Sequence, residues 1–309
     1  MHPYHILLAV LVTAVWGCNF IFVKLGLNEI PPFLLCTLRF LLVSIPVVFF
    51  IPKPKIAFSQ IIYYGLFTFG FQFAFLFMGM QADMPAGLSS LIFQIQVFFS
   101  LILAAIILDE KPSSLQVIGG IISFLGLGLV WSKISHSASW VGFVLEICGA
   151  ASWAVGNLVT KKIGRVNSLS LVAWGCLVST PPLLVLSLIM EGPALIVTSL
   201  QHISWLAIAS VVFITYISTL FGYGVWNWLL GLYPVASVIP FGLLVPMFGM
   251  FGSSLVFHEP MEPWKLNAAC LIILGLSINV FGPRLLTAYL RKPKEEPVSE
   301  PIISPDASS

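Results

Sequence analysis

Charged residues are scarce in this chain of 309 residues. Asp, Glu, Lys and Arg make up 8% of it, whereas a typical soluble domain is about one quarter charged. Hydrophobic residues make up 59%, and the mean hydropathy is +1.03. Such a composition excludes an ordinary soluble protein, because most of its surface could not be solvated by water. The net charge of +2 arises from a few loop and tail residues, so it offers no basic patch and we expect no nucleic-acid partner.

Motifs for catalysis and for metal binding are also missing. The chain contains no GxSxG, no HExxH and no Gly-rich phosphate loop ending in Lys-Ser or Lys-Thr. Its five histidines nowhere pair at ligand spacing, and its five cysteines fall inside apolar runs without a CxxC motif. We therefore expect free thiols, no catalytic residue, no metal and no cofactor.

Long apolar runs recur along nearly the whole chain. Each run has 18 residues or more and can cross about 30 Å of hydrocarbon as a helix. The sequence therefore predicts an all-α integral membrane protein with ten transmembrane helices and short loops. The expected helices cover residues 5–23, 33–52, 58–80, 86–108, 114–132, 140–159, 169–190, 203–230, 234–256 and 264–283. After Arg291 the chain is rich in Lys, Glu, Pro and Ser, and residues 285–309 are expected to be a disordered tail.

The basic residues predict the orientation. Ten Lys and Arg residues lie on one side of the expected spans, three lie on the other, and Arg39 alone lies within a span. By the positive-inside rule, both termini are expected in the cytoplasm. Lys24, Lys133 and Lys265 are then on the outer side.

An internal repeat divides the chain into two halves. The interval from Pro85 to Glu110 has the same length as the interval from Pro234 to Glu259, and "AVWGCNFIFVK" is echoed by "ASWAVGNLVTK". Each half holds five expected spans, and an odd number of crossings inserts the halves in opposite directions. We therefore predict two inverted five-helix repeats, residues 1–135 and 136–284.

Several short motifs are spread along the chain: Trp16-Gly17-Cys18-Asn19-Phe20, Arg39-Phe40, Met84-Pro85-Ala86-Gly87, Asp109-Glu110, His258-Glu259 and Asn279-Val280-Phe281-Gly282. With the ten expected spans, they resemble the EamA branch of the drug/metabolite transporter superfamily, and the resemblance covers about residues 5–283. It implies a bacterial inner-membrane exporter of small metabolites, similar to the exporters of cysteine and O-acetylserine. Four-span relatives carry a proton-binding carboxylate in their first helix; this chain has none there, so proton coupling stays open.

Polar and aromatic residues at helical spacing mark a candidate substrate site. Glu146, Gly149, Trp153 and Asn157 share one helix face, and Trp16 with Asn19 forms the counterpart in the first helix. Such a face either lines a substrate cavity or bonds neighbouring helices.

Other helices contribute further candidates. They are Gln72, Gln94 and Trp226. Trp226 shares a helix face with Thr215, Thr219 and Gly222. Gln96 points away from Gln94, so both cannot line one cavity.

Arg39 and Glu146 are candidates for gating or coupling. Both lie about six residues inside spans that start from the outer side, which predicts a charge pair between them. The alternatives are that Arg39 snorkels or binds a substrate carboxylate, and that Glu146 alone carries a proton.

Prolines and helix ends complete the prediction. Pro46 and the Pro181-Pro182 pair occupy similar places in the two halves and indicate bends or moving elements. Ser113 with Gln116 predicts a capping box. Glu110 and Glu259 are expected only to end helices at the membrane surface.

The leading prediction is a secondary-active exporter with a small-molecule substrate that works by alternating access. The alternatives are export of a drug, polyamine or nucleotide precursor, and a membrane-embedded enzyme. Glycines in residues 114–132 allow close helix contacts either within the chain or in a homodimer.

Overall fold

The computed structural model describes residues 2–107, 113–137, 139–163, 166–232 and 239–290. Within these ranges every regular element is a helix. The expected tail was wrong for residues 285–290, whose apolar sequence Leu-Leu-Thr-Ala-Tyr-Leu continues the last helix, α15 (Pro263–Leu290). Residues 291–309, the Asp109-Glu110 segment and the start of the ninth expected helix lie outside the described residues.

The elements follow the expected spans in order. The first half contains α1 (Pro3–Leu27), α2 (Pro32–Val48), α3 (Phe58–Gly65), η1 (Leu66–Phe71), α4 (Gln72–Gln81), α5 (Ala86–Ile92), η2 (Phe93–Ile95), α6 (Gln96–Ile107) and α7 (Ser114–Ser137). The second half contains α8 (Trp140–Ile163), α9 (Ser168–Leu186), η3 (Ser187–Glu191), α10 (Gly192–Gln201), α11 (Trp205–Val212), η4 (Phe213–Phe221), α12 (Gly222–Leu232), η5 (Ile239–Leu244), α14 (Val245–Phe257) and α15 (Pro263–Leu290).

These helices are long and apolar enough for a multi-span membrane protein. Among the residues that the structure describes, six continuous helical runs meet the length and hydropathy of a membrane span, and four shorter apolar helices accompany them. Together they agree with the ten predicted helices. The prediction was wrong for residues 192–201, where a loop was expected and the short helix α10 forms instead.

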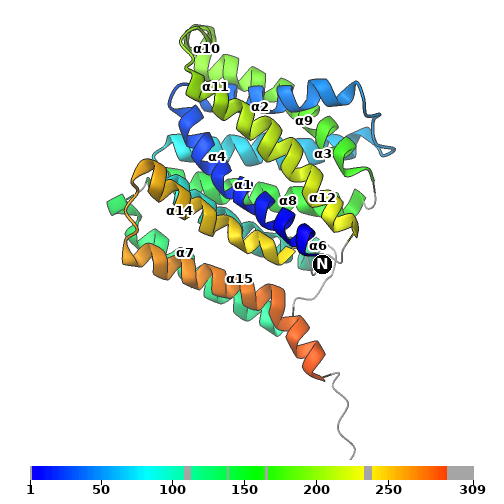
Figure 1. Cartoon of the computed structure of the whole chain (residues 1–309), viewed down its shortest axis with the longest axis vertical. Helices are drawn as coiled ribbons and strands as arrows, with labels where there is room; N and C mark the ends of the chain where they lie inside the picture. The colour runs from blue at the N-terminus through cyan, green and yellow to red at the C-terminus, as the bar shows by residue number, and fades with distance from the viewer. Residues whose placement is uncertain (1, 108–112, 138, 164–165, 233–238, 291–309) are drawn as a thin grey trace, which may run out of the picture.

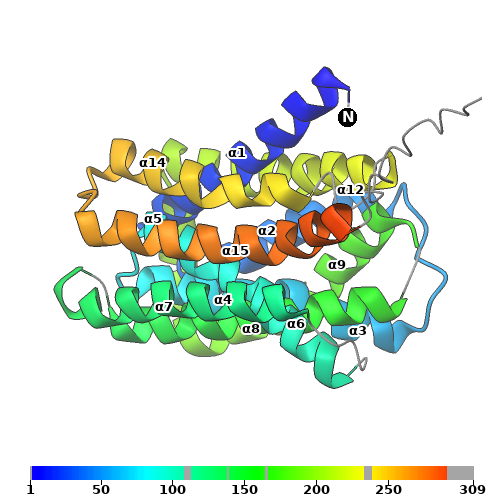
Figure 2. The same ribbon diagram turned by 90° about the horizontal axis from the view of Figure 1, so that it is seen from below.

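The long helices run roughly side by side, and the start of α1 lies at the same end of the bundle as the end of α15 (Figures 1 and 2). At its start α7 has the predicted capping box, in which Ser113 N–H donates to Gln116 Oε1 and Gln116 N–H donates to Ser113 Oγ. This prediction is confirmed.

Prolines coincide with irregular or terminal turns. Pro46 lies in the last turn of α2, and Pro181 and Pro182 lie in α9 shortly before the π-helical η3. Pro240 is in the 3-10 segment η5, and Pro246 is in the first turn of α14.

Two π-helical segments occupy matching places in the predicted repeats. The segment η1 begins at Leu66, eight residues after Phe58 starts its span, and η4 begins at Phe213, eight residues after Trp205 starts its span. A π-helical turn is rare and occurs frequently at functional sites. The third residue of each segment is a buried threonine, Thr68 in η1 and Thr215 in η4.

Helix contacts follow the pattern that an inverted repeat requires. Exchange of the halves relates the first helix to the sixth, the third to the eighth and the fourth to the ninth. The contact of α1 with α14 then corresponds to that of α8 with α6, and the contact of α4 with α8 to that of η4 with α1. The contacts of α2 with α9 and of α7 with α15 correspond to themselves. This pairing supports the two predicted repeats.

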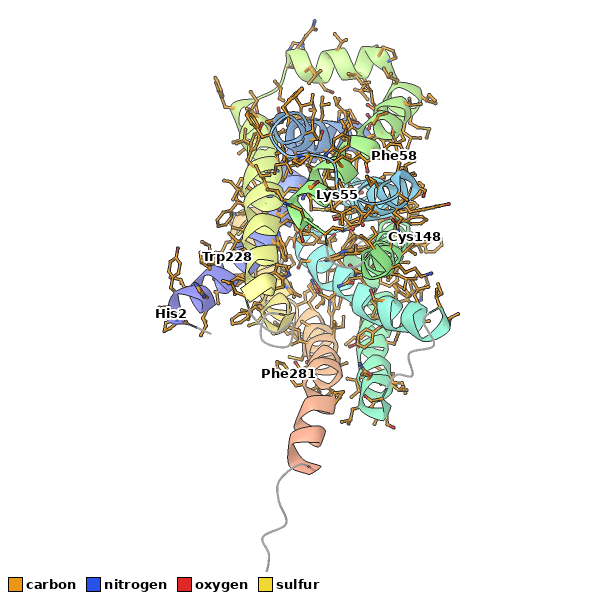
Figure 3. The ribbon with its side chains drawn as sticks, turned by 90° about the vertical axis from the view of Figure 1, so that its right-hand side faces the viewer. His2, Lys55, Phe58, Cys148, Trp228 and Phe281 are labelled. Atoms are coloured by element: carbon orange, nitrogen blue, oxygen red, sulfur yellow. The ribbon has the colours of Figure 1, made fainter. Side chains whose placement is uncertain are left out.

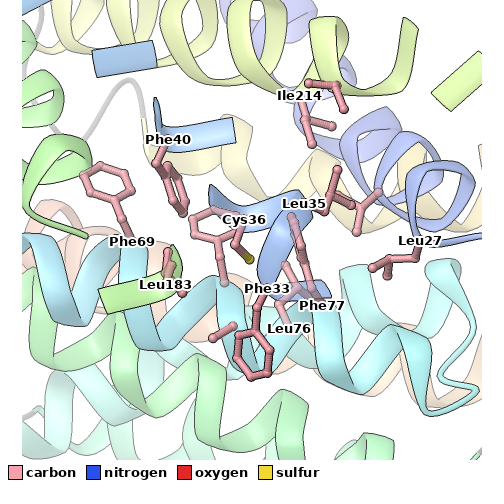
Figure 4. Close-up of a cluster of buried hydrophobic side chains, with 14 of the residues drawn as sticks. Leu27, Phe33, Leu35, Cys36, Phe40, Phe69, Leu76, Phe77, Leu183 and Ile214 are labelled. Carbon is pink, nitrogen blue, oxygen red and sulfur yellow. The ribbon is translucent and has the colours of Figure 1, made fainter. Parts of the chain in front are cut away.

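The main apolar core lies where both halves meet. Side chains of α1, α2, η1, α4, α9 and η4 converge there, including Leu27, Cys36, Phe40, Phe69 and Ile214 (Figure 4). Seen nearly along the helices, side chains also stand out around the rim, Phe281 among them (Figure 3). Many of these exposed side chains are large and apolar, as lipid contact requires.

Candidate functional site

In the described part of the chain, six buried polar side chains each leave one polar atom without a hydrogen-bond partner. These atoms are Asn19 Oδ1, Arg39 Nη1, Thr68 Oγ1, Gln72 Oε1, Glu146 Oε2 and Thr215 Oγ1. We refer to these residues as the six polar groups. A buried polar atom without a partner costs about 1 to 3 kcal/mol, and lipid cannot supply the missing bond. Six such atoms within one bundle indicate places where water, an ion or a substrate binds.

Arg39 is the cation among the six polar groups. Its side chain is 2% exposed, and both Nε and Nη2 donate to Thr219 Oγ1, at 3.1 and 3.0 Å. The guanidinium carbon lies 4.2 Å from the centre of the Phe73 ring, so a neutral hydroxyl and an aromatic face surround the charge.

Glu146 lies against a different set of residues. Its Oε1 accepts a hydrogen bond from Ser89 Oγ at 2.6 Å, and its side chain is fully buried. Gly79 provides space for it, because a Cβ atom there would lie 3.1 Å from Glu146 Cγ.

The predicted charge pair between Arg39 and Glu146 is therefore not present. Arg39 bonds to η4 and Glu146 bonds to α5, and no contact joins the two side chains. The prediction used depth along each helix, which says nothing about the direction in which a side chain points.

Trp16 and Trp226, two of the predicted substrate-binding residues, contact each other. Their ring centres are 5.1 Å apart, and Trp16 Nε1 donates to the Ser218 carbonyl of η4 at 3.0 Å. Gly222 makes room for this indole, since a Cβ atom at Gly222 would lie 2.6 Å from Trp16 Nε1. Tyr223 completes the cluster, with its ring centre 5.4 Å from that of Trp16.

Trp153 of α8 belongs to a second aromatic group, together with Phe93 and Phe20 of the first half. Its ring centre is 6.0 Å from that of Phe93, which in turn lies 6.4 Å from Phe20. Gln94 follows Phe93 in η2 and is buried. The closely packed Gly149 connects this group to Gln72, because an added Cβ would meet both the Phe93 ring and the Gln72 carbonyl.

Asn157 is separated from the buried part of its helix face. Glu146 and Gly149 are buried, whereas Asn157 is exposed and donates to Gln96 Oε1 at 2.8 Å and to Ser100 Oγ at 3.2 Å. The face of α8 thus runs from the buried interior to an exposed polar contact with α6. Its partner Gln96 is the glutamine that, by helical periodicity, points away from the buried Gln94.

Three glutamates bridge the predicted halves at one end of the bundle. Glu29 accepts from the Ser204 N–H at 2.7 Å and from its hydroxyl at 2.6 Å. Glu191 accepts from the N–H groups of Phe33 and Leu34 at the start of α2, at 2.6 and 3.0 Å.

Glu259 forms the third bridge, from the end of α14 to the start of α5. Its Oε1 accepts from the Ala86 N–H at 3.1 Å, and its Oε2 accepts from Ser253 Oγ at 2.8 Å. Lys24 Nζ donates to the Met80 carbonyl, which places the ends of α1 and α4 at the same end of the bundle. We call this the capped end. A carboxylate at a helix N-terminus satisfies free N–H groups and interacts favourably with the helix dipole.

Sequence reasoning missed the role of these glutamates. Glu259 was expected only to end a helix, and Glu29 and Glu191 were not singled out. Each lies after an apolar span, but its partner is more than 150 residues away in the chain. No local spacing could have identified that partner.

The cysteines and the histidines show no sign of a metal site. All five cysteines are free, and the described part of the chain has no group of three His, Cys, Asp or Glu residues that could hold a metal. Cys148 and Cys270 are exposed on the surfaces of α8 and α15, and Cys36 and Cys176 are buried.

Comparisons with known proteins match almost the whole chain. A protein of Salmonella typhimurium named "Probable amino-acid metabolite efflux pump" is 41% identical over 286 residues, which cover 90% of this chain and 95% of that protein. A protein of Escherichia coli strain K12 with the same name is 40% identical over 283 residues, with the same coverage. The uncharacterized transporter YoaV of Bacillus subtilis is 26% identical, covering 87% of this chain and 94% of its own.

A solved crystal structure shares the fold. It is 16% identical, with a TM-score of 0.62, and the match covers 95% of this chain and 100% of that one. The model of the EamA-like transporter family matches residues 3–132 and again residues 140–281. The chain therefore belongs to the EamA-like transporter family, whose members are multi-span membrane transporters.

Proposed function

We propose that this protein is a secondary-active exporter of amino acids or their derivatives in a bacterial inner membrane. The observation that carries the proposal is the set of six polar groups, whose unpartnered atoms lie inside an apolar bundle. Together with the aromatic side chains around Trp16 and Trp153, they provide hydrogen-bonding groups and apolar walls for a small polar solute. The names of the relatives from Salmonella typhimurium and Escherichia coli point to amino-acid metabolites as that solute.

The proposed mechanism is alternating access by two inverted repeats, residues 1–135 and 136–284. The two separate matches to the family model support this division. In the structure the three glutamate bridges hold the halves together at the capped end, which the count of basic residues assigns to the outside. This arrangement fits a state closed toward the outside, and rocking of the halves would break the bridges.

Glu146 is the proposed coupling group. It is the acidic member of the six polar groups, and one of its oxygens is free to bind a proton. Coupled export would require Glu146 to gain and lose a proton as the halves move. Glu146→Gln should therefore abolish transport driven by a pH gradient, yet leave exchange of substrate across the membrane intact.

Transport into proteoliposomes tests the proposal. Uptake of L-cysteine and O-acetyl-L-serine should be saturable, and Gln72→Ala should reduce it at least tenfold. Gln81→Ala is a matched control, because Gln81 is an exposed glutamine at the end of the same helix. If the purified protein moves neither solute, or if Gln72→Ala transports normally, this function or this site is wrong.

Orientation is tested separately. A reporter that is active only in the cytoplasm should be active when fused after Arg284. Activity of a periplasmic reporter at that position would contradict cytoplasmic termini.

A further inference from the structure

Arg39 carries a charge that no acidic side chain among the described residues neutralises. Arginine stays protonated in proteins, and Arg39 is almost fully buried within α2. Its hydrogen-bond acceptor, Thr219 Oγ1, is neutral and itself donates to the Ile214 carbonyl at 2.8 Å. Among the described residues Arg39 forms no ion pair, because the predicted partner Glu146 bonds elsewhere. A bound anion would supply the missing countercharge.

The geometry of the guanidinium leaves one buried edge without a hydrogen-bond partner, which such an anion would supply. Nε and Nη2 form one edge of the planar group, and this edge is occupied by Thr219. Nη1 has no partner, so the Nη1 and Nη2 edge still offers two roughly parallel N–H groups. A carboxylate binds such an edge with both oxygens.

The charge balance favours a carboxylate over a phosphate. One guanidinium neutralises one negative charge, whereas a phosphate monoester carries about two charges near pH 7. The ring of Phe73 covers one face of the guanidinium, so the anion approaches in the plane of the group. This approach suits the planar carboxylate.

The other five polar groups complement the second charge of an amino acid. Their unpartnered atoms are all oxygens, from two amides, two threonine hydroxyls or the Glu146 carboxylate, and every one can accept a hydrogen bond. Gln72 is adjacent in sequence to Phe73, which lies against Arg39. An α-ammonium group needs three such acceptors. Thr215 lies four residues before Thr219, the hydrogen-bond partner of Arg39, in η4. Gln72 and Thr215 are therefore the members of the set on elements that contact Arg39, and they offer two of these acceptors.

We propose that Arg39 binds the carboxylate of a zwitterionic substrate through its free Nη1 and Nη2 edge and thereby selects α-amino acids over solutes without a carboxylate. This inference rests on the proposed export of amino-acid metabolites and adds the residue that recognises them.

Competition between two probes tests this selectivity. The probes are L-cysteine and L-cysteinamide, which differ by replacement of the carboxylate with a neutral carboxamide. A charge-assisted bidentate contact should make the wild-type protein prefer L-cysteine by about 10- to 100-fold. Arg39→Gln should reduce this preference to about threefold or less, and Arg39→Lys should retain part of it.

A matched control and a second measurement separate recognition from folding. Lys162→Gln removes a positive charge from the exposed end of α8 and should leave the preference unchanged. In the wild-type protein, L-cysteine should protect Arg39 from an arginine-selective dicarbonyl reagent, as read by mass spectrometry, and L-cysteinamide should not. Arg284 serves as the internal reference for the labelling.

The outcomes are distinct. An unchanged preference in Arg39→Gln, or equal protection by both probes, would overturn the role of Arg39 even if the protein exports amino acids. If Arg39→Gln does not fold, the protection experiment decides. Absence of transport of both probes by the wild-type protein would instead contradict the proposed function.

Discussion

Glu191 holds the start of α2 to the end of η3, and its removal should open the capped end. Its carboxylate accepts from the Phe33 and Leu34 N–H groups and from Ser187 Oγ, at 2.6, 3.0 and 2.6 Å. Glu191→Gln removes the negative charge and leaves one acceptor oxygen in place of two. Hydrogen bonds to a charged group contribute about 1.5 to 3 kcal/mol each, against about 0.5 to 1.5 kcal/mol for neutral ones.

The expected loss follows from these contacts. Allowing for non-additivity within one group, the change should weaken the bridge by about 2 to 3 kcal/mol. Because 1.4 kcal/mol is a factor of ten, the population that is open at the capped end should rise by about 30- to 140-fold. Part of the loss falls on folding stability, so the variant should also unfold at a lower temperature.

The buried thiol of Cys36 reports this opening. Cys36 lies one turn after Phe33 and is fully buried. With the other four cysteines replaced, a membrane-impermeant maleimide added outside the cell should label Cys36 slowly in the wild-type background. Glu191→Gln should accelerate the labelling by at least tenfold.

A nearby glutamate gives the control. Glu262 bonds to Trp264 and pairs with Lys265 within its own helix start, so it does not join the halves. Glu262→Gln should leave the labelling rate unchanged. Equal labelling of wild type and Glu191→Gln would refute the assignment of Glu191 to a closing contact, and labelling only from the cytoplasmic side would reverse the orientation.

Three further predictions concern stability, each measured by thermal unfolding in detergent. Hydrogen bonds from the hydroxyl and the backbone N–H of Ser204 lower the pKa of Glu29. The ionised carboxylate therefore stabilises the fold above the ordinary carboxyl pKa, and this stabilisation is lost as the pH falls through the lowered pKa. Glu29→Gln should remove this acid sensitivity of the unfolding temperature, and an unchanged pH profile would contradict the argument. Thr219→Val leaves two N–H groups of Arg39 without an acceptor and should cost about 2 to 3 kcal/mol, whereas Thr219→Ser should cost less. Gly222→Ala forces a Cβ against the neighbouring indole and should cost about 1 to 3 kcal/mol, while Gly224→Ala, in open space on the same helix, should be nearly neutral. Equal losses for Thr219→Val and Thr219→Ser would contradict the hydrogen-bond argument, and equal losses for Gly222→Ala and Gly224→Ala would contradict the packing argument.

Helix positions were largely predictable from the sequence. In lipid every backbone N–H and C=O group must be satisfied within the chain, so an apolar run of sufficient length has few alternatives to a helix. The ends were less accurate, since polar residues such as Lys162 continue α8 beyond the apolar run. The helix α10 was missed because the segment from Gly192 to Gln201 was read as a connection between spans.

The candidate site was only partly predictable. Helical spacing identified faces that carry Asn19 and Glu146, Gln72 was a separate candidate, and the structure buries all three. The same spacing assigned Asn157 to the face of Glu146, but the structure exposes Asn157. Periodicity shows in which direction a side chain points from its own helix. It does not show whether another helix covers that side chain at its position along the helix.

The sequence by itself determined that this protein is an all-helical membrane protein, because composition and run length reflect the solvent that each segment must face; the transporter role came from the resemblance of its short motifs to the EamA family. The tertiary structure alone decided which polar atoms find partners. Arg39 bonds to Thr219, 180 residues away, and Glu191 bonds to Phe33, 158 residues away. Hydrogen bonds form only over about 3 Å and in a defined direction, so they depend on the packing of helices from both halves. That packing leaves the free edge of Arg39 and closes the capped end.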